Sequence, residues 1–404
     1  MIRAAAFAAC CCLVAHAALA DEDFELHGYG DYRLVVPAQE TSWVNGGLGK
    51  TRFGGGGVDG RFGAAGLVGK AQLAPDLEAV ADVQLTSSDS AELDLAEAYL
   101  RYRPVSTTRW RYTIKAGEFF PPISFENQGI GWTSPWTLTP SAINSWVGEE
   151  LRAIGTEASL EWRGDDETYE AGFALFGAND PAGTILMDRG WSFDDLVNGI
   201  GSQIRMPDAI ASRTGDPTPY RYDPFLEIDN KPGYYADFTW RSREWGRVTL
   251  LRYDNNADPS ADLSNGVYAW RTQFWSLGGQ TRFGDLDLLA QVMTGSTQIA
   301  PSATFNRITD FQAGYLMAAI TFGEWQPALR LDLFGTQQPG VSGTSELSEH
   351  GNAVTLALNW RPKPWLRYTA ELLRVDSWRL QRLQEGLSPH AVDIQGQLAT
   401  RVFF

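Results

Sequence analysis

LEAVADVQLT, residues 77–86, alternates between two kinds of position. One set is apolar throughout and contains Leu77, Ala79, Ala81, Val83 and Leu85. The other set is mainly polar and contains Glu78, Val80, Asp82, Gln84 and Thr86. Successive side chains of a strand point to opposite faces, whereas helical spacing mixes the two sets. The stretch therefore predicts a β-strand with one apolar and one polar face.

The same period of two recurs in 24–34, 169–175, 329–333 and 366–372. These segments are about ten residues long, the length of a tilted strand that crosses a bilayer. Mean hydropathy is only −0.24, and no stretch after the N-terminal region resembles an apolar membrane-spanning helix. The apolar residues are instead dispersed one position in two. This leaves a membrane barrel or a large soluble β protein.

Short and long connections alternate between the predicted strands. The short ones lie at 74–76, 104–108, 164–166, 242–244, 284–285, 323–324 and 362–364. The long ones lie at 37–57, 87–91, 118–149, 179–232, 255–266, 295–310, 335–350 and 377–391. Outer-membrane barrels have short periplasmic turns and longer external loops. The layout predicts an all-β, antiparallel transmembrane barrel of about sixteen strands, a size that leaves an aqueous channel.

Aromatic residues gather next to the short connections. They are Tyr102, Trp110, Trp162, Tyr169, Trp240, Trp245, Phe283, Phe322, Trp325, Trp360 and Trp365. Such a band is typical of the interfacial girdle of a membrane barrel. The alternative is a soluble β-sandwich whose strands end in aromatic residues. Because seven turns are flanked alike, we favour the membrane barrel.

The N-terminal residues 1–20 resemble a secretory signal peptide. A basic Arg3 precedes a short apolar run, and Ala18-Leu19-Ala20 fits the small-residue cleavage pattern. The three cysteines lie inside this run, so residues 21–404, predicted to form the barrel, contain none. Backbone pairing and packing, not disulfides, must hold the mature chain together.

Two short motifs, ELHGYGDYRL at 25–34 and RVFF at 401–404, complete the pattern. Together with the layout, they resemble the outer-membrane porin superfamily of Gram-negative bacteria. The resemblance implies a homotrimer with one channel per subunit, in contact with outer-membrane lipid and lipopolysaccharide. It also implies that the third external loop folds into the pore and that Phe404 is recognised by the outer-membrane assembly machinery.

The third long connection, 118–149, has the character of a pore loop. It is rich in proline and large aromatic rings, which a solvated surface loop does not need. Its negative charge comes from Glu118, Glu126 and Glu149, and Glu150 follows directly. We expect these carboxylates at a pore constriction. A loop packed on the outer mouth or against a neighbouring subunit is the alternative.

Strand parity places basic residues on the inward face. They are Arg33 on the first strand and Arg101, Arg103, Arg111 and Lys115 on the fourth and fifth. An acidic loop opposite a basic wall would set a transverse field across the pore and favour polar solutes. The alternative is that these charges pair with inward acidic residues. The net charge of −16 does not decide ion preference, because much of the acid lies in external loops.

The resulting functional prediction is a passive diffusion channel for small hydrophilic solutes and ions. A porin selective for anionic or small organic solutes stays open, although only five lysines argue against a phosphate specialist. A barrel hydrolase using His350 with Ser345 or Ser348 and a non-conducting structural barrel are the alternatives of other classes. We expect no enzymatic activity, cofactor, metal or nucleic-acid partner.

Overall fold

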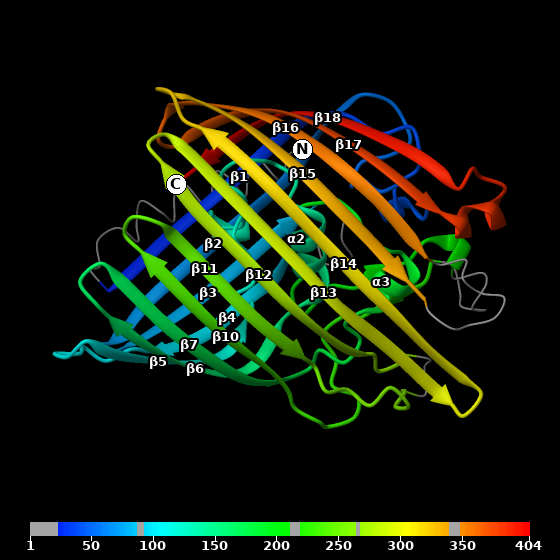
Figure 1. The fold of residues 1–404 in the computed structure, drawn as a ribbon. Helices are drawn as coiled ribbons and strands as arrows, with labels where there is room; N and C mark the ends of the chain where they lie inside the picture. The colour runs from blue at the N-terminus through cyan, green and yellow to red at the C-terminus, as the bar shows by residue number, and fades with distance from the viewer. Residues whose placement is uncertain (1–22, 87–92, 211–218, 264–266, 339–347) are drawn as a thin grey trace.

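The computed structural model describes residues 23–86, 93–210, 219–263, 267–338 and 348–404. The predicted signal peptide, the three cysteines and the whole predicted connection at 87–91 lie outside these ranges. Figure 1 shows strands that tilt together around one barrel, with the short turns gathered at one end and the long loops at the other.

The described residues form a closed antiparallel barrel of sixteen strands. These are β1 (Phe24–Val36), β2 (Asp59–Ala74), β3 (Leu77–Thr86), β4 (Leu93–Tyr102), β5 (Trp110–Phe119), β6 (Ala153–Arg163), β7 (Glu167–Gly177), β10 (Gly233–Ser242), β11 (Gly246–Asp254), β12 (Arg271–Phe283), β13 (Leu286–Ser302), β14 (Phe305–Ile320), β15 (Trp325–Gln337), β16 (Glu349–Lys363), β17 (Leu366–Arg379) and β18 (His390–Phe403). The barrel closes where β1 pairs with β18, from Tyr29↔Phe403 to Val36↔Gly396. The predicted all-β barrel is confirmed.

Exposure follows the predicted alternation. On β15, Leu331 and Leu333 are 47% and 69% exposed, whereas Arg330 and Asp332 are buried at 0% and 2%. On β18, Leu398 and Val402 face outward, while Gln397 and Arg401 are buried. These two strands thus present apolar surface outward and polar side chains to the barrel interior, which is the pattern of a barrel surrounded by lipid.

The short connections and the aromatic band match the prediction, but one long connection does not. Residues 295–310 were expected to be a loop, which is wrong. β13 and β14 run almost to the hairpin tip and still pair at Ile299↔Arg307 and Ser302↔Phe305. Polar threonine and glutamine residues occupy both faces there, so the apolar alternation that marks a strand is missing although the backbone ladder continues.

Several short elements lie in the long loops. They include the helices α2 (Ala142–Glu150) and α3 (Thr184–Asp188) and 3-10 turns at Trp43–Asn45, Ile130–Trp132 and Leu380–Glu385. A small separate sheet pairs β8 (Ile204–Arg205) with β9 (Arg221–Tyr222). Among the described residues, no helix is long and apolar enough to cross a membrane.

Helix α2 lies inside the barrel, where Figure 1 shows it behind the strands of the front wall. Every residue of α2 is buried, and the Ser141 hydroxyl caps its first turn by accepting from the Asn144 N–H. An aromatic cluster surrounds the helix: the Trp146 ring lies 5.4 Å from that of Phe311, 5.6 Å from Phe274 and 6.0 Å from Trp191. The hydrophobic core of this protein therefore sits within the barrel, between loops and wall.

Candidate functional site

Three loops contribute to the barrel interior: the first loop (37–58), the third loop (120–152) and the fourth loop (178–232). The third loop is held by inward side chains of β15 to β17. Glu371 accepts from the N–H groups of Leu138 at 2.5 Å and Thr139 at 3.2 Å. Asn359 donates to the Trp136 carbonyl at 2.7 Å. Because wall side chains supply the partners of the loop backbone, the loop is fixed against one side of the barrel.

Glu126 forms the centre of this attachment. Its carboxylate lies 3.2 Å from Arg330 Nη1 and accepts from the Ser141 N–H at 2.6 Å. Arg330 also donates to the carbonyls of Thr139 at 2.7 Å and Pro140 at 2.8 Å, and pairs with Asp332 at 2.8 Å. Glu126 and Arg330 are both 0% exposed. The predicted pore carboxylate thus meets the inward arginine of β15.

The two acids of α2 join the third loop to the fourth. Glu149 pairs with Arg189, whose Nη1 lies 3.0 Å away. Glu150 accepts from Trp146 Nε1 at 2.5 Å, the Tyr222 hydroxyl at 2.6 Å and the Ile185 N–H at 3.1 Å. Burial raises the pKa of Glu150 above its usual range, against the effect of these donors. Both acids stand at a helix C-terminus, where negative charge is unfavourable and requires such partners.

Glu118, at the end of β5, lies in an acidic neighbourhood around Arg152. It is 5% exposed, and its Oε1 has no hydrogen-bond partner among the described residues. Arg152 is fully buried, stacks 3.4 Å above the Phe120 ring and donates to the Leu151 carbonyl at 2.6 Å. Burial lowers the pKa of Arg152 to about 10, although the surrounding carboxylates favour its charge.

Arg33, the first of the predicted basic residues, belongs to a buried arginine–aspartate cluster. Its members are Asp31, Arg33, Arg52, Asp195 and Arg401. Arg33 lies 2.8 Å from Asp31 and 2.5 Å from Asp195, and Arg52 lies 2.8 Å from Asp195. Burial favours the neutral form of Asp195, but the charges of Arg33 and Arg52 outweigh it and hold the pKa of Asp195 well below its usual range. The cluster ties β1 and β18 to the first and fourth loops.

The remaining basic residues lie on β4 and β5 or at the turn between them, and they are more exposed. Arg101 pairs with Glu78 at 2.7 Å, and Lys115 pairs with Glu157 at 3.2 Å. Arg111 is half-buried, with Glu161 as its register partner, and Arg103 is exposed at the short turn after β4. Among the described residues, no ion pair joins these four to the third-loop carboxylates. The predicted acidic group and the predicted basic group therefore do not pair with each other. The third-loop carboxylates contact Arg330 and Arg189, whereas Arg101 and Lys115 contact carboxylates of neighbouring strands.

Sequence reasoning missed the residues of the first and fourth loops. Lys50 Nζ lies 2.6 Å from Glu349 and donates to the Trp191 carbonyl at 3.0 Å. Burial lowers the pKa of Lys50 to about 8, even though the Glu349 charge opposes the shift. The GGLGKT stretch around Lys50 reads as a glycine-rich external loop. No local signal marks its buried partner, which is 299 residues away.

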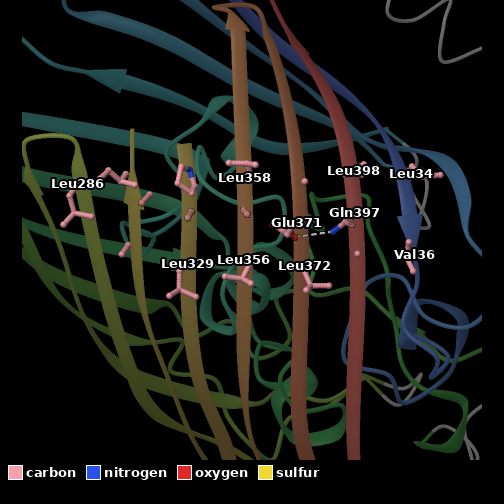
Figure 2. A pocket seen from close by; sticks show the side chains of 18 residues that line it. Leu34, Val36, Leu286, Leu329, Leu356, Leu358, Glu371, Leu372, Gln397 and Leu398 are labelled. Atoms are coloured by element: carbon pink, nitrogen blue, oxygen red, sulfur yellow. Dashed lines mark hydrogen bonds between the residues drawn. The ribbon is translucent and has the colours of Figure 1, made fainter. Parts of the chain in front are cut away.

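The outer surface carries an apolar groove of about 620 Å³ across β1 and β13 to β18. Figure 2 shows Leu329, Leu356, Leu372 and Leu398 along these strands, with the Gln397–Glu371 hydrogen bond beside them. That bond, 3.4 Å long, belongs to the polar interior face. A single layer of β-sheet therefore separates an apolar outer surface from a hydrogen-bonded barrel interior.

The histidine that invited a hydrolase hypothesis lies at the outer surface. His350 is exposed, and its ring stacks on Trp378 at 5.3 Å. Within the ranges that the structure covers, no carboxylate oxygen lies within 4 Å of its ring nitrogens. The hydroxyl of Ser348 accepts from the Gln338 N–H at 3.3 Å, and Ser345 lies outside the described residues.

Comparisons with known proteins find the same architecture. No protein-family model matches the chain, and no curated protein matches it. Among solved structures, the outer membrane channel DcaP of Acinetobacter baumannii is similar at a TM-score of 0.57 and 11% identity, over 95% of this chain and 97% of that one. An anion-selective porin from Comamonas acidovorans gives 0.51 and 11%, over 94% and 99%. Salmonella typhi OmpF, solved with daunomycin, gives 0.51 and 13%, over 94% and 97%.

These likenesses identify the class of fold. The closed barrel, its sixteen strands and its matches over nearly the whole chain show that the protein has the fold of the sixteen-stranded outer-membrane porins. The fold that the resemblance implied is confirmed.

Proposed function

We propose that the protein is an outer-membrane porin, a channel for passive diffusion of small hydrophilic solutes and ions. The observation that supports this most is the pairing of an apolar outer face with a charged inner face around sixteen strands. Barrels of this size enclose enough space for an aqueous path.

The path follows a charged strip on β3 to β6, β10 and β11. This strip consists of Glu78, Arg101, Lys115, Glu157, Asp237 and Arg247, all only half-buried. We infer that it lines the short-turn end of the solute path, which we call the vestibule. Further along, the aromatic cluster of Trp146, Trp191, Phe274 and Phe311 fills the interior. We infer that this is a closed arrangement and that the third and fourth loops must shift before solutes pass.

The packed interior also favours a second candidate, a non-conducting structural barrel. Trp146 is 2% exposed, and Trp191 and Phe193 are 0% exposed. Side chains packed this densely leave no continuous water column at their level. In a channel, the third and fourth loops must leave this packed position at times, whereas in a structural barrel they stay there.

Liposome swelling separates them. Folded protein in vesicles should admit small neutral sugars slowly, and Trp146→Ala should accelerate entry several-fold, because it removes the ring that joins α2 to the wall. Gel migration before and after boiling checks that each barrel is folded. Vesicles that stay impermeable with both folded proteins would support the structural barrel and contradict the channel.

Solute selectivity, oligomeric state and membrane insertion extend this proposal. Preference for anionic or small organic solutes is the selective alternative, and arginine donors on the interior face are compatible with it. We also propose a homotrimer in contact with lipid and lipopolysaccharide, inserted by the outer-membrane assembly machinery after cleavage of the signal peptide. Native mass spectrometry in detergent tests the oligomer directly.

A further inference from the structure

Arg367 on β17 and Arg401 on β18 form a pair of like charges inside the barrel. They are direct cross-strand partners, and each is only 2% exposed. Side chains directly opposite each other in an antiparallel pair are near neighbours, and like charges there repel. Burial strengthens the repulsion, so this arrangement requires a compensating negative charge.

The two guanidinium groups also keep unused donors. Arg367 Nη1 donates to the carbonyls of Ser134 at 3.3 Å and Pro135 at 3.1 Å, while its Nε and Nη2 have no hydrogen-bond partner. Arg401 donates through Nε and Nη2 to Asp31, while its Nη1 has none. Buried N–H groups are normally satisfied by protein, water or an ion. Three nitrogens of one pair are not satisfied by protein.

No carboxylate among the described residues pairs with Arg367. Asp31 is shared by Arg33 and Arg401, and Asp195 by Arg33 and Arg52. In the part of the chain that the structure describes, no carboxylate oxygen lies within 4 Å of the Arg367 guanidinium. The nearby Arg361 adds a further cation and donates to the Pro135 carbonyl at 2.6 Å.

A small cavity adjoins this region. Its volume is about 10 Å³, and Arg401, Tyr29 and Ser134 line it together with the carboxylate-bearing Asp195. Arg367 is not part of this lining and reaches the region through its hydrogen bond to the Ser134 carbonyl. A space of this size admits one water-sized occupant and excludes an organic solute or a phosphate group. A water molecule would satisfy one or two donors but would leave the charge of Arg367 uncompensated, because Asp31 already pairs with Arg33 and Arg401.

We propose that Arg367 and Arg401 bind a small monovalent inorganic anion of the halide class, independently of transport. The anion accepts from the free nitrogens of both residues and offsets their repulsion. Because Arg367 also donates to Ser134 and Pro135, anion binding stabilises the position of the third loop against the wall. The site goes beyond the proposed channel function, since it is a resident site and not a step in solute passage.

Bromide is the probe that tests the site. Crystals of the full protein grown in sodium bromide should show an anomalous peak within hydrogen-bonding distance of Arg367 and Arg401, at the highest occupancy of any bromide in the barrel. In detergent, the unfolding temperature should rise by a few degrees in chloride or bromide compared with gluconate at equal ionic strength. Arg367→Gln should abolish this difference, whereas the matched variant Arg361→Gln should keep it.

A site that contains only water in the bromide crystals would overturn the proposal. A halide effect that is equal in Arg367→Gln and wild type would overturn it as well. If Arg367→Gln does not fold, the bromide crystals of the wild-type protein still decide the question.

Discussion

Gly28 and Phe404 close the barrel through a pair of backbone hydrogen bonds. The Gly28 N–H donates to the Phe404 carbonyl at 2.9 Å, and the Phe404 N–H donates back at 3.0 Å. The Phe404 ring lies over Gly28 so closely that a Cβ at Gly28 would sit 2.3 Å from it. The aromatic ring predicted to guide assembly therefore depends on a glycine of the first strand.

Gly28→Ala should displace the Phe404 ring and lower the yield of folded barrel. Gly30→Ala is the matched control, because its Cβ would meet only Ala65 at 3.8 Å. The measured quantity is the heat-modifiable fraction on a gel after refolding. We expect Gly28→Ala and Phe404→Ala to reduce this fraction alike, with Gly30→Ala near wild type. Equal yields for both glycine variants would refute the steric dependence.

Glu126 and Arg330, 204 residues apart, fix the third loop to β15. Glu126→Gln keeps the shape of the side chain but removes the charge that faces a buried guanidinium. It should destabilise the loop attachment by about 1–3 kcal/mol, the cost of weakening a buried charged hydrogen bond. We expect faster proteolysis within the third loop and a larger mean conductance. Glu161→Gln, in the half-exposed vestibule, is the control that should change neither; similar proteolysis of both variants would contradict the assignment.

Lys50 predicts a pH dependence with a defined sign. Its pKa in the packed loops is about 8, below its usual range, because burial disfavours the charged form. The packed state therefore binds the proton more weakly than a state with the first loop released. The stability of the packed state therefore rises between pH 8 and the usual pKa of lysine. Conductance should fall over this interval. The charged groups facing Lys50 are Glu349, Arg379 and Arg189.

Lys50→Met should remove this component of the pH profile. The control Lys363→Met, exposed at a short turn, should retain it. Conductance recorded in steps from pH 7 to 10 gives the comparison. A conductance that rises with pH in the wild-type protein would have the wrong sign for this mechanism.

Lys115 is the vestibule cation whose removal should alter ion preference. It is 18% exposed and lies 3.2 Å from Glu157. Lys115→Gln frees the Glu157 charge, so the reversal potential across a salt gradient should shift toward cation preference. Arg109→Gln, at the exposed turn before β5, should leave the reversal potential unchanged. Identical potentials for all three proteins would remove Lys115 from the ion path.

The sequence predicts the strands of the barrel better than the contacts of the loops packed inside it. Residues 77–86 reveal β3 because lipid and lumen select different side chains at alternate positions. The pairing of Thr297 with Thr309 escapes the same reasoning, since strand ends beyond the lipid carry polar residues on both faces. Contacts such as Arg33 with Asp195 join a strand to a loop 162 residues away. Strand alternation predicts that the Arg33 side chain points into the barrel. It does not predict the partner of Arg33, because the path of a long loop follows no repeating sequence pattern.

The account depends most directly on whether the folded barrel conducts ions. Single-channel recording in planar bilayers, with wild-type protein and Trp146→Ala side by side, measures this. We predict small, intermittent openings for the wild type and larger, longer openings for Trp146→Ala, as expected for a porin barrel closed by its own loops. Repeated insertion of folded protein with no conductance from either variant would contradict the channel.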